Sequence, residues 1–203
     1  MNVALIGATG NAGSRILAEL VRRGHSVTAI ARNIEKVPAE KGVTPKRGDV
    51  SDAAGLAALL KGHDVAISAV HFSDSDPRTL IGAVKTAGVK RYLVVGGAGS
   101  LEVAPGTRLV DTPQFPAEYK QEASKGADFL DILRGEKELD WTFLSPSALF
   151  MPGERTAKFR LGGDSLLVDA SGKSHVSMED YAIALVDEVE KPAHSRRRFT
   201  VGY

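Results

Sequence analysis

The sequence predicts an α/β fold in which a parallel sheet is covered by helices on both faces. Short, wholly apolar runs such as Val3–Ile6 are typical of parallel strands that are buried on both sides. Segments with apolar residues at helical spacing alternate with these runs, and such alternation indicates repeated strand–helix–strand units. A length of 203 residues suits one domain, spanning 1–203.

The individual elements follow from periodicity and from turn residues. Apolar or β-branched runs predict strands at residues 3–6, 26–30, 43–46, 65–70, 92–95, 141–144 and 198–201. The first helix carries apolar residues at 16, 17, 20 and 21 and ends before Gly24, and further helices cover 56–60, 77–88 and 116–134. Ser177-Met178-Glu179-Asp180 is a capping-box pattern, which predicts a last helix with Tyr181, Leu185 and Val189 facing inward.

Residues 147–176 differ from the rest of the chain. They contain paired glycines and little helical periodicity, and Leu166–Val168 with His175-Val176 predicts a β-hairpin. We interpret this segment as a small C-terminal cap over the carboxyl ends of the strands, and not as a separate domain.

Composition excludes several classes of protein. The net charge of +1 provides no electrostatic footprint for nucleic acid, and the run Arg196-Arg197-Arg198 is interpreted as a solvated strand edge. The absence of cysteine excludes disulfides and thiolate-based catalysis or metal binding. No apolar run approaches the roughly 20 residues that cross a bilayer, and the N-terminus shows no signal-peptide pattern. We therefore expect a cytoplasmic protein without membrane contact, as a monomer or a homodimer.

A glycine-rich loop follows the first strand and precedes an amphipathic helix. Gly7, Gly10 and Gly13 form the pattern G-x-x-G-x-x-G, with Thr9, Asn11 and Ala12 among the intervening residues. The first glycine permits a tight turn, the second lets the backbone approach a pyrophosphate, and the third allows the helix to pack closely on the strand. The helix N-terminus adds free N–H groups and a positive dipole end. In this context the loop predicts a Rossmann-type, doubly wound fold that binds a dinucleotide.

Residues after the second and third strands indicate which dinucleotide the loop binds. NAD-binding domains usually place Asp or Glu at the end of the second strand to hold the ribose hydroxyls. Here Arg32 and Asn33 follow Ile30-Ala31, and a guanidinium can pair with the additional 2′-phosphate, so NADPH is favoured and NAD is the less favoured cofactor. In Gly48-Asp49-Val50 the acid is a candidate acceptor for the adenine amino group, or alternatively a cap of the next helix.

Together these residues resemble the atypical short-chain dehydrogenase/reductases. Within that group the chain resembles NADH-flavin reductases, which are related to flavin reductase/biliverdin reductase B and to NmrA-like proteins. The likeness rests on Gly7–Gly13, Arg32, residues 48–50 and the small-residue end of the fourth strand, and it extends to Glu118-Tyr119-Lys120 and to the C-terminal Phe199–Tyr203. It implies cofactor contacts from a further set of residues, namely Ala69, Val70, His71, Gly96, Gly97, Lys120, Pro146 and Ser147.

The catalytic residues of the family are not all present. Catalytic short-chain dehydrogenases use Tyr-x-x-x-Lys, in which the lysine lowers the pKa of the tyrosine for proton transfer. The candidate here is Tyr119, but the residue four positions later is Ala123, and Lys120 and Lys125 are off that helical face. Ser100 is a second candidate, either as a substrate hydrogen-bond partner or as a loop cap.

His71 is the third candidate, because it follows the fourth strand at the edge where open α/β sheets bind ligands. An ordinary loop histidine is the alternative. His71, Asp74 and Asp76 also suggest a loose metal-ligand set, but Asp76-Pro77 is typical of a helix start, so no metal is expected.

Without an acid–base pair, hydride transfer to a flavin or a quinone-like small molecule is the favoured reaction, since the cofactor supplies the chemistry and solvent can supply the proton. Two alternatives stay open. One is an NmrA-like redox sensor that binds the dinucleotide without turnover. The other is a sugar-nucleotide epimerase or dehydratase, which the missing tyrosine–lysine motif and the short cap disfavour.

Overall fold

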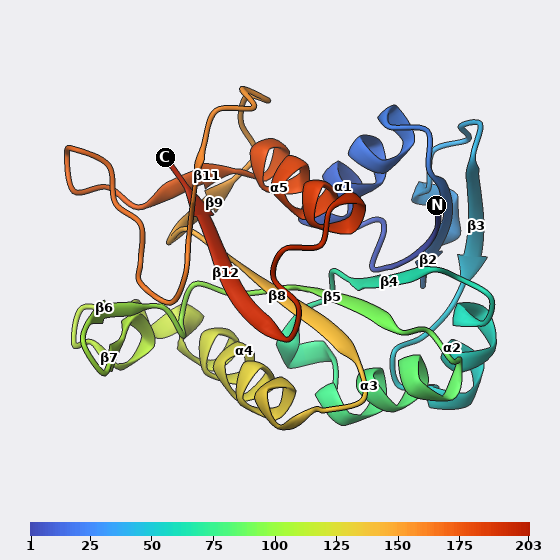
Figure 1. Ribbon diagram of the computed structural model, residues 1–203, viewed down its shortest axis with the longest axis horizontal. Coiled ribbons are helices and arrows are strands. Elements are labelled where there is room, and N and C mark those ends of the chain that lie inside the picture. The colour runs from blue at the N-terminus through green and yellow to red at the C-terminus, as the bar shows by residue number, and fades with distance from the viewer.

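The computed structural model describes residues 1–203, and its main feature is a mostly parallel eight-stranded sheet (Figure 1). The strands of this sheet are β1 (Asn2–Ile6), β2 (Ser26–Ala31), β3 (Val43–Arg47), β4 (Val65–Ser68), β5 (Arg91–Val95), β8 (Asp140–Pro146), β10 (Arg160–Gly162) and β12 (Arg197–Gly202). Their order is β10-β12-β8-β5-β4-β1-β2-β3, and only the β10–β12 pair is antiparallel. This arrangement confirms the Rossmann-type α/β fold.

Helices cover both faces of the sheet. In Figure 1, α1 (Asn11–Arg22) and α5 (Met178–Glu190) lie side by side above it, and α2 (Ala53–Leu60), α3 (Pro77–Thr86) and α4 (Ala117–Gly135) lie below. Alternate residues of β1 supply two separate cores: Val3 and Leu5 pack with α1 and α5, whereas Ala4 and Ile6 pack with the other three helices. Because successive side chains of a strand point to opposite faces, a fully apolar strand is what this double layer requires.

The strand order reverses at β1, whose neighbours are β2 on one side and β4 on the other. A crevice therefore opens beyond the carboxyl ends of these strands, where ligands of doubly wound folds bind. The strand β4 ends at Ser68, earlier than predicted, so Ala69 and Val70 lie in the loop that enters this crevice.

The predicted hairpin in the segment 147–176 is wrong. The turn exists, since Asp169 N–H donates to the Lys173 carbonyl at 2.8 Å, but its flanks do not pair with each other. Instead Leu166 N–H donates to the Glu102 carbonyl at 2.9 Å, and β11 (His175–Ser177) pairs in parallel with β9 (Leu149–Met151). Local alternation marks a residue as extended but does not identify its partner strand.

The start of α5 fastens the segment 147–176 to the domain. Ser177 caps the helix as predicted, with its Oγ accepting from Asp180 N–H at 3.0 Å. The fully buried Asp180 carboxylate accepts the backbone N–H groups of Thr156 and Ala157, both at 2.8 Å, and the Tyr203 hydroxyl at 2.8 Å. These contacts explain how a segment with little regular secondary structure is held in one conformation.

The run of arginines 196–198 is only in part a solvated edge. β10 pairs with residues 200–202 alone, and Arg197 is exposed beside the uncovered part of β12. Arg198, however, has a side chain that is only 2% exposed, and its Nε donates to Asp164 Oδ1 at 2.8 Å. The prediction was wrong for Arg198 because β12 is buried from residue 198 onward, and this arginine pairs with Asp164 inside the protein.

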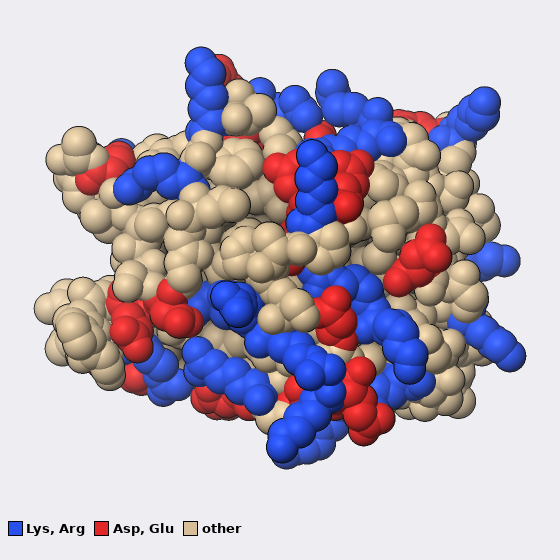
Figure 2. Space-filling model, viewed as in Figure 1, with Lys and Arg blue, Asp and Glu red and all other residues tan.

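Over the face seen in Figure 2, basic and acidic side chains are interspersed. None of the helices combines the length and apolar character that a membrane-spanning helix needs.

Candidate functional site

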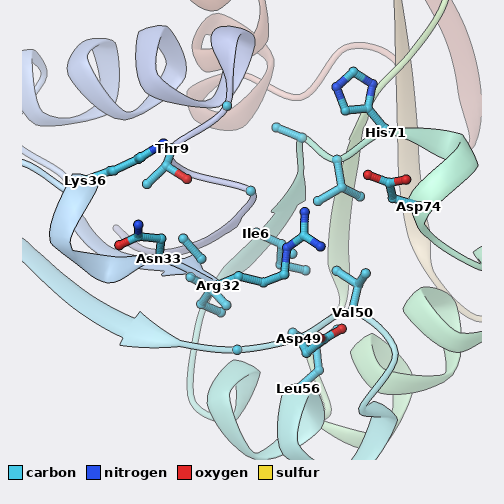
Figure 3. Close-up of a pocket in the computed structure, with 17 residues that line it drawn as sticks. Ile6, Thr9, Arg32, Asn33, Lys36, Asp49, Val50, Leu56, His71 and Asp74 are labelled. Carbon is cyan, nitrogen blue, oxygen red and sulfur yellow. The ribbon is translucent and has the colours of Figure 1, made fainter.

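A cleft of about 310 Å³ lies at the carboxyl ends of β1 to β4 (Figure 3). It collects residues from the glycine loop, from the ends of β2 and β3, and from the loop after β4. The lining residues are Ile6, Gly7, Thr9, Gly10, Ile30, Ala31, Arg32, Asn33, Lys36, Gly48, Asp49, Val50, Leu56, Ala69, Val70, His71 and Asp74. Most of the cofactor-binding residues predicted from the first four strands thus lie together.

The glycine loop has the geometry of a phosphate cradle. A Cβ on Gly7 would lie 2.3 Å from the Ala69 carbonyl oxygen, and one on Gly13 would lie 2.1 Å from the Gly7 carbonyl oxygen, so both positions require glycine. Gly10 differs, because its added Cβ would contact nothing closer than 3.4 Å and the residue lines the cleft. Gly10 is also the N-cap of α1 and supplies no side-chain cap, which leaves the first helical N–H groups for a ligand anion.

Asn11 and Ala12 begin α1 directly after this glycine, and they are therefore at the place where a bound pyrophosphate would meet the helix N-terminus. Gly13 is buried between the helix and the loop, which is a packing position. A pyrophosphate therefore fits the loop through backbone atoms.

Two cationic side chains stand at one end of the cleft. Figure 3 shows the Arg32 guanidinium extending into the cavity, and Lys36 lines the same cleft. Asn33 shapes this end by capping a short 3₁₀ helix, Ile34–Lys36, since its Oδ1 accepts from Glu35 N–H at 3.2 Å. Sequence reasoning missed Lys36, although a second basic residue four positions after Arg32 was the available signal.

Asp49 lies opposite Arg32 at the same end. Its Oδ1 accepts both the N–H and the hydroxyl of Ser51, at 2.9 and 2.7 Å. These hydrogen bonds and the charge of Arg32 hold the pKa of Asp49 below its usual range. The cap of α2 is Asp52, whose Oδ1 accepts from Gly55 N–H at 3.0 Å, so the alternative reading of Asp49 as the helix cap is wrong.

The loop after β4 forms the other end of the cleft. Val70, His71 and Asp74 line it, and Asp74 is the last residue of the 3₁₀ helix η2 (Phe72–Asp74). Asp76 is the N-cap of α3, because its Oδ2 accepts from Thr79 N–H at 2.7 Å, which is the helix start that the sequence predicted.

An acidic residue that sequence reasoning missed holds this loop. Glu122 of α4 accepts Phe72 N–H at 2.7 Å through Oε1 and Ser73 N–H at 2.8 Å through Oε2. Its Oε1 also lies 3.4 Å from His71 Nδ1. Partial burial disfavours the charged carboxylate, but the two backbone hydrogen bonds outweigh it and lower the pKa of Glu122.

The remaining predicted residues lie outside this cleft, along the ends of β5 and β8 and at the start of α4. Gly96 follows β5 and packs against Phe143, whose ring an added Cβ would meet at 2.3 Å, while Gly97 faces Phe72. Pro146 ends β8, and the buried Ser147 donates its hydroxyl to the Val201 carbonyl at 3.0 Å.

Ser100 and Tyr119 differ strongly in their exposure. Ser100 is 8% exposed and lies 3.4 Å from Arg198 Nη1, so its hydroxyl serves an internal contact. Tyr119, in the first turn of α4, is 63% exposed, and Lys120 beside it is exposed as well. Ala123 packs on the loop after β5, since a Cβ on Gly99 would lie 2.8 Å from it. No tyrosine–lysine pair is formed at this position.

Comparison with known proteins points in the same direction as the geometry. Residues 7–192 match the model of a family described as NAD(P)H-binding. The Bacillus subtilis protein YwnB is 44% identical over 209 residues, which cover 99% of this chain and 98% of YwnB. An NAD(P)H azoreductase from Xenophilus azovorans is 26% identical over 206 residues, covering 98% of this chain and 67% of that enzyme.

Solved structures superpose over the whole chain. A candidate epimerase from Bacteroides thetaiotaomicron has a TM-score of 0.95 and 45% identity, with coverage of 100% of this chain and 96% of that one. A candidate NADH-flavin reductase from Streptococcus pneumoniae has a TM-score of 0.85 and 39% identity, with coverage of 100% and 99%.

Proposed function

The chain belongs to the NAD(P)H-binding family, in the atypical short-chain dehydrogenase/reductase and NmrA-like group, and we propose that it is an NADPH-dependent reductase of a flavin or quinone-like small molecule. The observation that carries the proposal is that Arg32 and Lys36 line the same cleft as the glycine loop. A redox role is supported by the relatives named as a flavin reductase and an azoreductase.

The preference for NADPH follows from charge. The loop at Gly10 suits the pyrophosphate, which places the adenosine half toward the ends of β2 and β3. There the first side chain after β2 is Arg32, where NAD-binding domains have an acid that accepts from the ribose hydroxyl. A 2′-phosphate would gain charge-assisted hydrogen bonds from Arg32 and attraction from Lys36.

The choice of acceptor follows from the catalytic groups. When bound, the reduced nicotinamide supplies the hydride, and the residues of the chain bind and orient both molecules. The position four residues after Tyr119 holds Ala123, packed on a loop, so the proton relay of alcohol dehydrogenation is missing. Conjugated acceptors suit this site, because they accept hydride without that relay.

Cofactor titrations test the proposal. We expect Arg32→Ala to weaken NADPH binding about 10- to 150-fold, equivalent to about 1.5–3 kcal/mol, and to leave NADH binding nearly unchanged. Lys36→Ala is expected to shift NADPH affinity in the same direction by less. Arg47→Ala is the matched control, because Arg47 is an exposed cation that ends β3 without lining the cleft.

Turnover is then measured as the loss of nicotinamide absorbance with panels of flavins and quinones. Equal NADPH affinity in wild type and Arg32→Ala would remove the 2′-phosphate assignment. Tight NADPH binding without turnover of any acceptor would instead favour the dinucleotide-binding sensor, which the missing tyrosine–lysine pair also permits.

A further inference from the structure

A histidine–carboxylate pair stands at the end of the cleft opposite Arg32. His71 lines the cleft, and its Nδ1 lies 3.4 Å from Glu122 Oε1. The two residues are far apart in the chain and come from different elements, the loop after β4 and the helix α4. The imidazole is 79% exposed, so its other ring nitrogen is open to a molecule in the cleft.

The Glu122 carboxylate is held in place by backbone hydrogen bonds that are independent of the histidine. Each of its carboxylate oxygens accepts a backbone N–H, from Phe72 at 2.7 Å and from Ser73 at 2.8 Å. A carboxylate held in this way attracts a protonated imidazole through its charge, and the 3.4 Å contact at Nδ1 leaves Nε2 as the working atom. The arrangement has the form of a catalytic histidine and the acid that orients it.

The loop that carries His71 is anchored by aromatic packing. The ring of Phe72 lies 5.8 Å from that of Phe129 at 85° and 6.2 Å from that of Phe143 at 17°. Gly126 of α4 makes room for it, because an added Cβ there would lie 2.8 Å from the Phe72 ring. The imidazole therefore stands on a preorganised support, which proton transfer in a fixed geometry requires.

The position of the pair matches the reacting half of the cofactor. The adenosine half is assigned above to the ends of β2 and β3, and a dinucleotide that crosses the glycine loop then extends its nicotinamide toward β4 and β5. His71 lies three residues after the end of β4, in the loop that enters the cleft. The other charged groups near it are Asp74 on its own loop and Lys125 of α4, whose Nζ lies 3.4 Å from the Ser73 carbonyl oxygen.

We propose that His71, oriented by Glu122, donates the proton that accompanies hydride transfer to the acceptor, in place of the missing tyrosine–lysine pair. This inference rests on the proposed reductase function. For a quinone, one oxygen receives hydrogen and two electrons as hydride, and the other oxygen receives the proton from His71 Nε2. The products are the hydroquinone and NADP⁺, and His71 recovers its proton from water.

A flavin makes a smaller demand on the histidine. Hydride transfer to the flavin ring yields a reduced anion that water can protonate later, so no proton is needed at the moment of transfer. A quinone and a flavin therefore distinguish a proton donor from a residue that only shapes the cleft.

The test compares His71→Asn with wild type on both acceptors. We expect kcat for the quinone to fall about 10²–10³-fold and kcat for the flavin to fall less than about tenfold, as loss of a general acid predicts. NADPH affinity is measured in parallel and should change much less than the quinone rate, although His71 also lines the cofactor cleft.

Two further variants complete the design. Glu122→Gln should lower kcat for the quinone and leave its KM and the flavin rate nearly unchanged, because the imidazolium loses its anionic partner. His175→Asn is the matched control, since His175 Nε2 pairs with Asp169 at 3.1 Å outside the cleft, and it should leave both rates unchanged.

The outcomes separate this inference from the proposed function. If His71→Asn binds NADPH normally and keeps its quinone rate within about threefold of wild type, His71 is not the proton donor and the reductase function stands. If wild type reduces no acceptor at all, both proposals are overturned.

Discussion

One added methyl group separates the role of the glycine loop in the fold from its role in binding. At Gly13 a Cβ would lie 2.1 Å from the carbonyl oxygen of Gly7 and 2.9 Å from its carbonyl carbon. Both are backbone atoms, so α1 must move away from the loop. Overpacking of this kind costs about 1–3 kcal/mol, and we expect Gly13→Ala to lower the free energy of unfolding by that amount.

Gly10→Ala should have the opposite pattern. The new Cβ would lie 3.4 Å from the nearest atom, and φ of −73° is ordinary for any residue, so only the weaker N-cap costs stability, at most about 1 kcal/mol. If NADPH binds as proposed, however, the added methyl group would stand where the pyrophosphate approaches the N-terminus of α1. Loss of one charge-assisted hydrogen bond, about 1.5–3 kcal/mol, raises the Kd for NADPH about 10- to 150-fold.

Urea unfolding and calorimetric NADPH titration measure the two effects separately. Gly82→Ala is the control, because Gly82 lies in α3 with open space around it, and alanine there should stabilise the helix by about 0.5–1 kcal/mol. Wild-type NADPH affinity in Gly10→Ala would refute the cradle, and a wild-type urea midpoint in Gly13→Ala would refute the packing argument.

Two further predictions concern catalysis and acid stability. Tyr119→Phe should lower kcat for the best acceptor by less than about tenfold, because this exposed tyrosine has no lysine partner; a hundredfold loss in steady-state rates would show that it transfers a proton. Burial disfavours the charged form of Glu19, yet hydrogen bonds from Arg155 and Arg23 outweigh it and lower its pKa. The stability that this carboxylate contributes is fully present above pH 4.5, its ordinary pKa, and is lost as the pH falls through its lowered folded-state pKa. We therefore expect Glu19→Gln to reduce the difference between the urea unfolding midpoints measured at about pH 7 and at about pH 4. An unchanged difference would contradict this.

The sequence alone determined the layered fold and one end of the cleft. Wholly apolar strands, amphipathic helices and a glycine loop are local patterns, because each depends on neighbours within a few residues. Arg32 was predicted in the same way, because it directly follows the second strand and therefore lies at the carboxyl end of the sheet. Those features predicted which residues would line the cleft around Gly7 and Gly10, and the structure places them there.

Only the tertiary structure decided which distant residues meet. Glu122 reaches the loop after β4 across about 50 residues of chain, and nothing near it in the sequence marks that contact. Arg198 is buried in β12, where its guanidinium donates to the Asp164 carboxylate. The Ser147 hydroxyl donates to the Val201 carbonyl of the same strand, so it is already engaged. The pairing of β11 with β9 is of the same kind. Periodicity records whether a residue is buried or extended, but the identity of its partner is set by how the helices and the sheet pack together.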